Sequence, residues 1–90
     1  MKYNFEDIKV NRELRYTLGK ETTTEKYYLS FPVRNSYVDY IEYYEISTEQ
    51  LNLFINNEEE LLVFLDECRR RKKDELMAFF PVAPMRGYPT

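Results

Sequence analysis

The stretch YVDYIEYYEISTEQLNLFI, residues 37–55, decides the fold, because the period of its apolar residues changes at Ser47. Before Ser47, tyrosine, valine and isoleucine are concentrated as they are in β-strands. After it, Gln50 follows Ser47 at the spacing of a helix capping box, and apolar residues then recur at i, i+3 and i+4. The sequence therefore predicts a strand over 37–46 and a helix over 48–56.

The residues before this stretch also follow a two-residue period. Segments 12–18 and 26–33 alternate apolar and polar side chains, and short polar connections separate them. Pro32 cannot donate to a sheet ladder, so we expect it near a strand end or on an edge. Residues 1–10 have a weaker pattern that fits either a strand or a capping turn.

The residues after the stretch predict a second helix and a last strand. Asn57 is placed to cap a helix over 58–73, whose apolar stripe includes Cys68. We expect Cys68 to be a small buried residue rather than a reactive thiol. Residues 75–80 read as a final strand that Pro81 ends.

These elements predict the α+β class: a small antiparallel sheet with two helices, both from the C-terminal half, packed on one face. Residues 1–80 would form a single domain, since ninety residues are too few for two cores. Residues 81–90 hold three prolines and predict an extended tail. This tail either frays or is pinned to the body or to a partner by residues such as Tyr88.

The composition limits the chemistry. The chain has no histidine, one cysteine and two glycines, which excludes zinc-finger sites, P-loops and dinucleotide-binding glycine fingerprints. We therefore expect no enzymatic activity, no cofactor and no metal. No apolar run approaches the length of a membrane span, the N-terminus does not resemble a signal peptide, and a lone cysteine suits a reducing compartment. These features predict a cytoplasmic protein.

Charge is divided unevenly along the chain. Residues 1–68 hold 7 basic and 14 acidic residues, whereas residues 69–90 hold 6 and 2. Nine carboxylates and no lysine or arginine lie between Asn35 and Cys68, and the five residues Arg69–Lys73 are all basic. The basic run would complement the dipole at a helix C-terminus, or it would form a nucleic-acid patch.

Most of the carboxylates lie in expected helices, where the dipole or an i,i+4 ion pair explains them. Acidic residues in the 37–46 strand have no such local reason, because Asp and Glu are depleted in strands. Together with neighbouring tyrosines they predict a surface for a basic protein partner, made of Tyr37, Asp39, Glu42, Tyr43 and Glu45. Glu42 alternates onto the core-facing side and would join this surface only if a bulge turned it outward. A solvated outer sheet face and a divalent-metal site are the alternatives.

The chain also resembles a bacterial toxin-immunity protein of the contact-dependent growth-inhibition kind. The resemblance lies in SYVDYIEYYEIS at residues 36–47, CRRR at 68–71 and RGYP at 86–89. It implies a cognate toxin encoded next door, but it transfers no site residues. The leading hypothesis is thus an immunity or inhibitor protein that neutralises a basic toxic enzyme, such as a nuclease. The alternative is a nucleic-acid-associated or regulatory module that uses residues 69–73, and a small enzyme is the third possibility.

Overall fold

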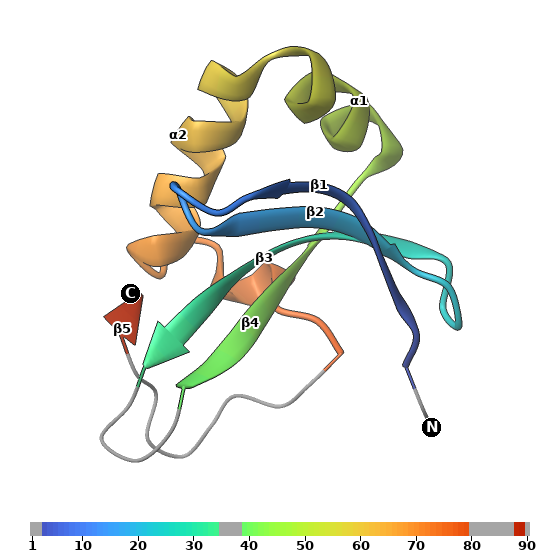
Figure 1. Ribbon diagram of the computed structural model, residues 1–90, viewed down its shortest axis with the longest axis horizontal. Coiled ribbons are helices and arrows are strands. Elements are labelled where there is room, and N and C mark those ends of the chain that lie inside the picture. The colour runs from blue at the N-terminus through green and yellow to red at the C-terminus, as the bar shows by residue number, and fades with distance from the viewer. Residues whose placement is uncertain (1–2, 35–38, 80–87, 90) are drawn as a thin grey trace.

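Four antiparallel strands follow one another in the same order along the chain and across the sheet (Figure 1). They are β1 (Phe5–Asn11), β2 (Tyr16–Glu21), β3 (Lys26–Arg34) and β4 (Asp39–Ile46). A two-residue strand, β5 (Tyr88–Pro89), pairs with the end of β3. The computed structural model describes residues 3–34, 39–79 and 88–89 of the chain. Within the predicted tail, the backbone at residues 88–89 thus returns to the sheet.

Two tight turns join the first three strands, and each contains one residue in the left-handed region, Arg15 and Glu25, both with φ of 58°. The side chain of Asn11 closes the first turn by accepting a hydrogen bond from the amide of Leu14 at 3.0 Å. Leu14 is therefore exposed in this turn, and its predicted place in a strand is wrong. Strand β2 begins only at Tyr16, while the weakly patterned residues before Asn11 do form a strand.

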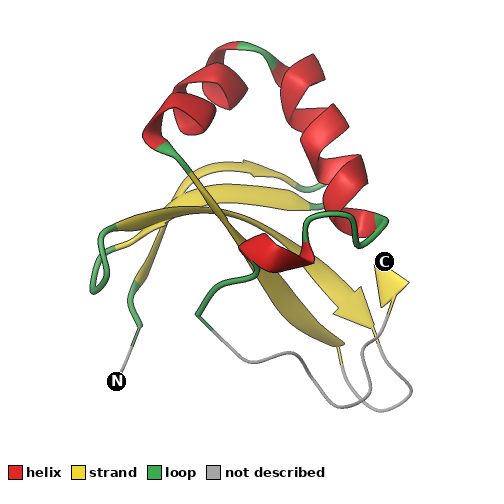
Figure 2. Ribbon diagram, turned by 180° about the vertical axis from the view of Figure 1, so that it is seen from behind, coloured by secondary structure: helices red, strands yellow, loops and turns green. Residues whose placement is uncertain are grey.

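The change of period at Ser47 is confirmed. Helix α1 (Thr48–Asn56) begins with a complete capping box, in which Ser47 Oγ accepts from the Gln50 amide at 3.1 Å and the Ser47 amide donates to Gln50 Oε1 at 2.9 Å. Helix α2 (Glu58–Arg69) is capped by Asn57, whose side chain accepts from the amide of Glu60 at 3.4 Å. Both helices cover one face of the sheet (Figure 2). No helix in the described residues is long and apolar enough to cross a bilayer.

Helix α2 ends four residues earlier than predicted, in a Schellman motif. Arg71 adopts a φ of 62°, its amide donates to the Cys68 carbonyl at 3.0 Å, and the Lys72 amide donates to the Glu67 carbonyl at 3.0 Å. Only Arg69 of the basic run is helical, and the remaining four residues form the turn that follows.

The main core lies between the helices and the facing side of the sheet. The strands contribute Leu18, Leu29, Phe31, Val33, Tyr44 and Ile46, and the helices contribute Leu51, Phe54, Leu61, Phe64, Leu65 and Cys68. The period-2 pattern thus assigned these faces of β3 and β4 to the core correctly. Cys68 is buried, as predicted, and burial raises the pKa of its thiol to about 12.

The final strand predicted over residues 75–80 is not formed in the described part of that segment. Residues Asp74–Leu76 make a single 3-10 turn, and Met77 pairs with Tyr44 through an isolated bridge. The amide of Ala78 then donates to the carbonyl of Tyr43 at 3.0 Å. Phe79, with a φ of 74°, turns the chain out of an extended conformation, which explains why the pairing does not continue. Phe80 lies outside the described residues.

Candidate functional site

The five residues predicted to bind a partner do not form one open surface. Tyr37 lies outside the described residues, and Asp39 is the first residue of β4, where its backbone pairs with Arg34. The other three members occupy both faces of β4, and each has a different environment.

Tyr43 belongs to a second apolar layer on the sheet face that lies away from the helices. Its ring stacks on Phe5 with centroids 4.5 Å apart and meets Tyr28 and Phe79 edge-on at 5.2 and 5.7 Å. We call this group, with Tyr3, the far-face aromatic cluster. Burial, with a smaller contribution from the nearby Asp7 carboxylate, raises the pKa of Tyr43. The expected open outer face is therefore wrong at Tyr43, because residues from both ends of the described chain pack against it.

Gly19 of β2 makes room for this cluster. A Cβ at this position would lie 2.5 Å from the backbone oxygen of Glu6 and 2.6 Å from Cζ of Tyr28. The Tyr28 ring therefore lies directly over the glycine, and its hydroxyl donates to Asp7 Oδ1 at 3.1 Å. Burial and this hydrogen bond both raise the pKa of Tyr28.

Glu42 is turned inward, so its predicted role in a surface is corrected. The side chain is only 5% exposed, and β4 pairs with β3 in continuous register without the bulge that would have turned it outward. Its carboxylate accepts hydrogen bonds from the hydroxyl of Tyr44 at 3.0 Å and from that of Tyr40 at 3.4 Å. These two tyrosines, at positions i−2 and i+2 on the same face of the strand, supply the partners that a buried carboxylate requires.

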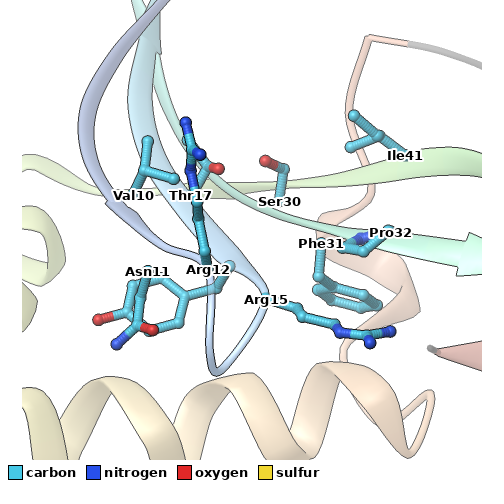
Figure 3. A pocket seen from close by; sticks show the side chains of 10 residues that line it. Val10, Asn11, Arg12, Arg15, Thr17, Ser30, Phe31, Pro32 and Ile41 are labelled. Atoms are coloured by element: carbon cyan, nitrogen blue, oxygen red, sulfur yellow. The ribbon is translucent and has the colours of Figure 1, made fainter.

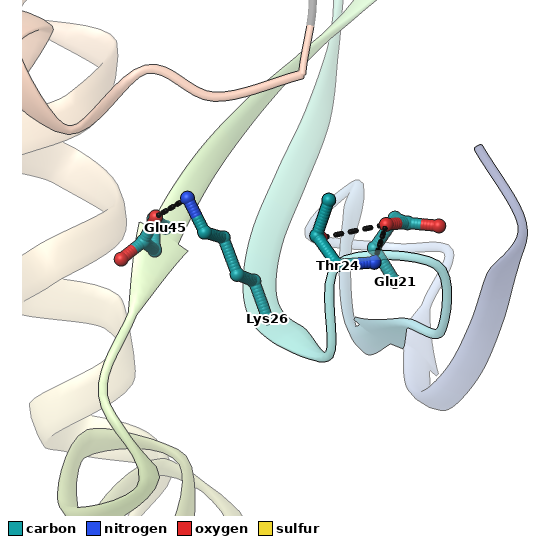
Figure 4. A network of polar contacts seen from close by, with 4 residues as sticks. All are labelled: Glu21, Thr24, Lys26 and Glu45. Carbon is teal, nitrogen blue, oxygen red and sulfur yellow. Dashed lines mark hydrogen bonds and ion pairs between the residues drawn. The ribbon is translucent and has the colours of Figure 1, made fainter. Parts of the chain in front are cut away.

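Glu45 is on the surface, but its charge is already paired. Its Oε1 lies 3.1 Å from Nζ of Lys26 on the adjacent strand, and both side chains are about half exposed (Figure 4). Exposed pairs of this kind contribute at most about 1 kcal/mol. The carboxylate would therefore meet a basic partner only in competition with Lys26.

Glu21, drawn with Thr24 in Figure 4, is a buried structural carboxylate that the sequence pattern did not single out. It is 0% exposed and accepts hydrogen bonds from the amides of Asn4, Thr23 and Thr24 at 2.7–2.9 Å and from the Thr24 hydroxyl at 2.7 Å. Burial alone would raise the pKa of Glu21, but these hydrogen bonds outweigh it and lower the pKa to about 2. Glu21 thus holds the β2–β3 turn closed.

The outer face of α2 carries acidic side chains around an apolar centre. Val63 is 59% exposed, and helical spacing places Glu59 and Glu60 one turn before it and Asp66 and Glu67 one turn after it. We call these five residues the acidic α2 face. Its second half is compensated, since Asp66 pairs with Arg70 at 3.0 Å and Glu67 with Lys73 at 3.6 Å.

The first half of the acidic α2 face has no compensation. Neither Glu59 nor Glu60 has a basic partner among the described residues, and both are exposed. Glu58, beside them in sequence, accepts from the hydroxyl of Tyr16 at 2.8 Å and from the Asn11 side chain at 3.2 Å. The hydrogen bond from Tyr16 is the main cause that lowers the pKa of Glu58. The sequence analysis attributed the first-turn glutamates of α2 to the helix dipole. It did not predict that Val63 would be exposed next to them.

The basic run has structural contacts. One terminal nitrogen of Arg69 donates to the carbonyl of Leu14 at 2.6 Å, and its guanidinium lies 5.6 Å from the centroid of the Phe31 ring. Burial is the main cause that lowers the pKa of Arg69. Arg69 thus fastens the end of α2 to the β1–β2 turn, and Arg70 and Lys73 form the ion pairs described above.

A cavity of about 220 Å³ opens beside this turn and reaches from the adjoining ends of β1 and β2 to β3 and β4 (Figure 3). Valine, proline and isoleucine side chains line it together with two arginines, a serine and a threonine. No cluster of three or more cysteine or acidic side chains suited to a metal ion occurs in the described parts of the chain. No protein-family model, curated protein or solved structure matches the chain.

Proposed function

We propose that this protein is an immunity or inhibitor protein that binds a basic toxic enzyme domain, such as a nuclease, and neutralises it. The observation that carries the proposal is the acidic α2 face. An exposed apolar centre with carboxylates on both sides is suited to a basic protein surface, because the apolar contact supplies affinity and the charges steer association.

The proposed binding surface is on the helices rather than on β4. In β4, Glu42 is buried, Tyr43 is packed in the far-face aromatic cluster and Glu45 is paired with Lys26. On α2, by contrast, Glu59 and Glu60 are exposed and have no basic partner among the described residues. A cationic active site that normally binds phosphates would find its complement there.

The test is co-expression and titration with the toxin domain encoded beside this gene. We expect a stable complex that abolishes the toxin's activity. The double variant Glu59→Lys, Glu60→Lys should weaken the complex by well over tenfold, since it places like charges across the interface. Both side chains are exposed, so the variant should stay folded, although each substitution removes a favourable interaction with the dipole of α2 and should lower the free energy of unfolding by about 0.3–1 kcal/mol.

The matched control is Asp39→Lys, Glu45→Lys, which makes the same change of charge on β4. We expect it to leave the affinity within about threefold of wild type. The reverse outcome would move the binding surface to the sheet, where the sequence had predicted it. A toxin domain that neither binds nor is inhibited, with salt-dependent binding of this protein to generic DNA or RNA instead, would overturn the proposed function.

A further inference from the structure

The cavity beside the β1–β2 turn exists because β3 lacks a neighbour along part of one edge. Strand β2 pairs with β3 only as far as Thr17 opposite Ser30, and β5 pairs with it from Val33 onward. Two residues of β3 lie between these pairings, Phe31 and Pro32. In the described parts of the chain neither has a strand partner on the edge that faces β2 and β5, and proline has no amide hydrogen to donate. A notch in the sheet results, and the cavity lies there.

Two hydroxyl groups, of Ser30 and Thr17, line the cavity. Ser30 is only 5% exposed, and neither its hydroxyl nor that of Thr17 makes a hydrogen bond within the residues that the structure describes. Neither hydroxyl oxygen is among the buried side-chain atoms that lack a partner, so water in the open cavity can reach both. An acceptor brought in by a ligand would replace that water at both groups.

Two arginines also line the cavity. In Figure 3 the side chain of Arg12 rises beside Thr17, and that of Arg15 lies beside Phe31 at the other end of the cavity. Neither arginine has an acidic partner among the described residues. The cavity is therefore positively charged, although the protein carries a net charge of −3.

The remaining walls are apolar. Val10 and Ile41 are each about half exposed at the cavity, and Pro32 lies between the strands that carry them. Concave apolar walls with a few convergent polar groups are typical of small-molecule sites. The volume of about 220 Å³ is below that of sites for drug-sized ligands, which favours a small compound over a polymer.

We propose that this cavity binds a small organic anion. Its carboxylate or phosphate would accept hydrogen bonds from Ser30, Thr17 and Arg12, and its apolar body would lie against Val10 and Ile41. The site is separate from the acidic α2 face, so it does not depend on the proposed function.

The test is a titration of ¹⁵N-labelled protein followed by amide chemical shifts, with sodium benzoate, phenyl phosphate and the neutral benzyl alcohol as probes. We expect the amides of Val10, Thr17, Ser30 and Ile41 to shift with one or both anions and not with the alcohol. The stronger of the two anions identifies the head group as carboxylate or phosphate.

Two variants assign the contacts. Ser30→Ala and Arg12→Gln should each weaken binding of the preferred anion by about tenfold, while Lys72→Gln, which removes an exposed charge outside the cavity, should not. The dispersion of each variant's spectrum shows that it is folded. Equal shifts with benzyl alcohol, shifts confined to residues 69–73, or no shifts at these four amides would each overturn the proposal.

Discussion

Replacing Gly19 with alanine tests whether the far-face aromatic cluster is built around the absence of a side chain in β2. The added Cβ would lie 2.5 Å from the Glu6 carbonyl oxygen, 2.6 Å from Cζ of Tyr28 and nearer still to the Tyr28 hydroxyl. Each of these separations is well below van der Waals contact, so the ring must move away from β2. That movement also breaks the hydrogen bond from Tyr28 to Asp7.

The magnitude follows from these contacts. Overpacking of a buried position costs about 1–3 kcal/mol, and loss of the hydrogen bond adds about 0.5–1.5 kcal/mol. The reduced backbone freedom of alanine in the unfolded chain offsets about 0.5–1 kcal/mol. Gly19→Ala should therefore lower the free energy of unfolding by about 2 kcal/mol.

Urea unfolding followed by far-ultraviolet circular dichroism measures this loss as a shift of the midpoint at constant slope. The matched background is Tyr28→Ala, which removes both clashing side-chain atoms. In that background we expect Gly19→Ala to cost less than in the wild type, because the contacts with Tyr28 are gone and only the contact with the Glu6 backbone carbonyl remains. An equal cost in both backgrounds, or a wild-type midpoint for Gly19→Ala alone, would refute this account of the cluster.

Three further predictions concern single side chains. Burial raises the pKa of the Cys68 thiol to about 12. At pH 8 the thiol should therefore react with a disulfide reagent roughly a thousandfold more slowly in the folded protein than in urea. Equal rates would show that the thiol is accessible in the folded protein. The Glu21 carboxyl has a folded-state pKa of about 2 against an ordinary 4.5, so the wild type should lose stability as the pH falls from about 4.5 to 2. Glu21→Gln should be less stable at pH 7 and lose less over that interval; parallel melting curves at every pH would contradict this. Arg69→Lys should lower the free energy of unfolding in urea by about 1–2 kcal/mol, because the hydrogen bond to the β1–β2 turn is lost. The control Lys72→Ala should stay within about 0.5 kcal/mol of wild type. Equal effects of the two substitutions would show that the contact of Arg69 with the turn has no specific role.

The helical half could be predicted from sequence because its signals are local. The capping box at Ser47, the cap at Asn57 and the spacing of the buried stripe each involve residues within one or two turns. The alternation along β3 and β4 likewise identified the core-facing side chains. These parts of the prediction depend on no contact between distant segments.

The errors occur where distant or specific contacts decide the structure. The run at residues 75–80 has the composition of a strand, but its described part forms one 3-10 turn and a single bridge to β4. Phe79 instead packs against Phe5 of β1 in the far-face aromatic cluster. Nothing in the spacing of Tyr43 distinguishes a ring that faces water from one covered by such segments. Glu42 differs, because Tyr40 and Tyr44 at i−2 and i+2 on the same face could have indicated its buried partners, a signal that the prediction did not use.

The far-face aromatic cluster also has a consequence for how the protein emerges from the ribosome. Phe5 and Phe79, whose rings meet edge-on at 5.4 Å, are made roughly seventy residues apart. The four-stranded meander and its capped helices contain mostly near-neighbour pairings, so they can assemble while synthesis continues. Phe5 can already cover part of the Tyr28 and Tyr43 rings at that stage, but the side of each ring that Phe79 contacts stays open until Phe79 has left the exit tunnel. Translation thus sets the order of assembly, with the helix side of the sheet packed first and the opposite side sealed last.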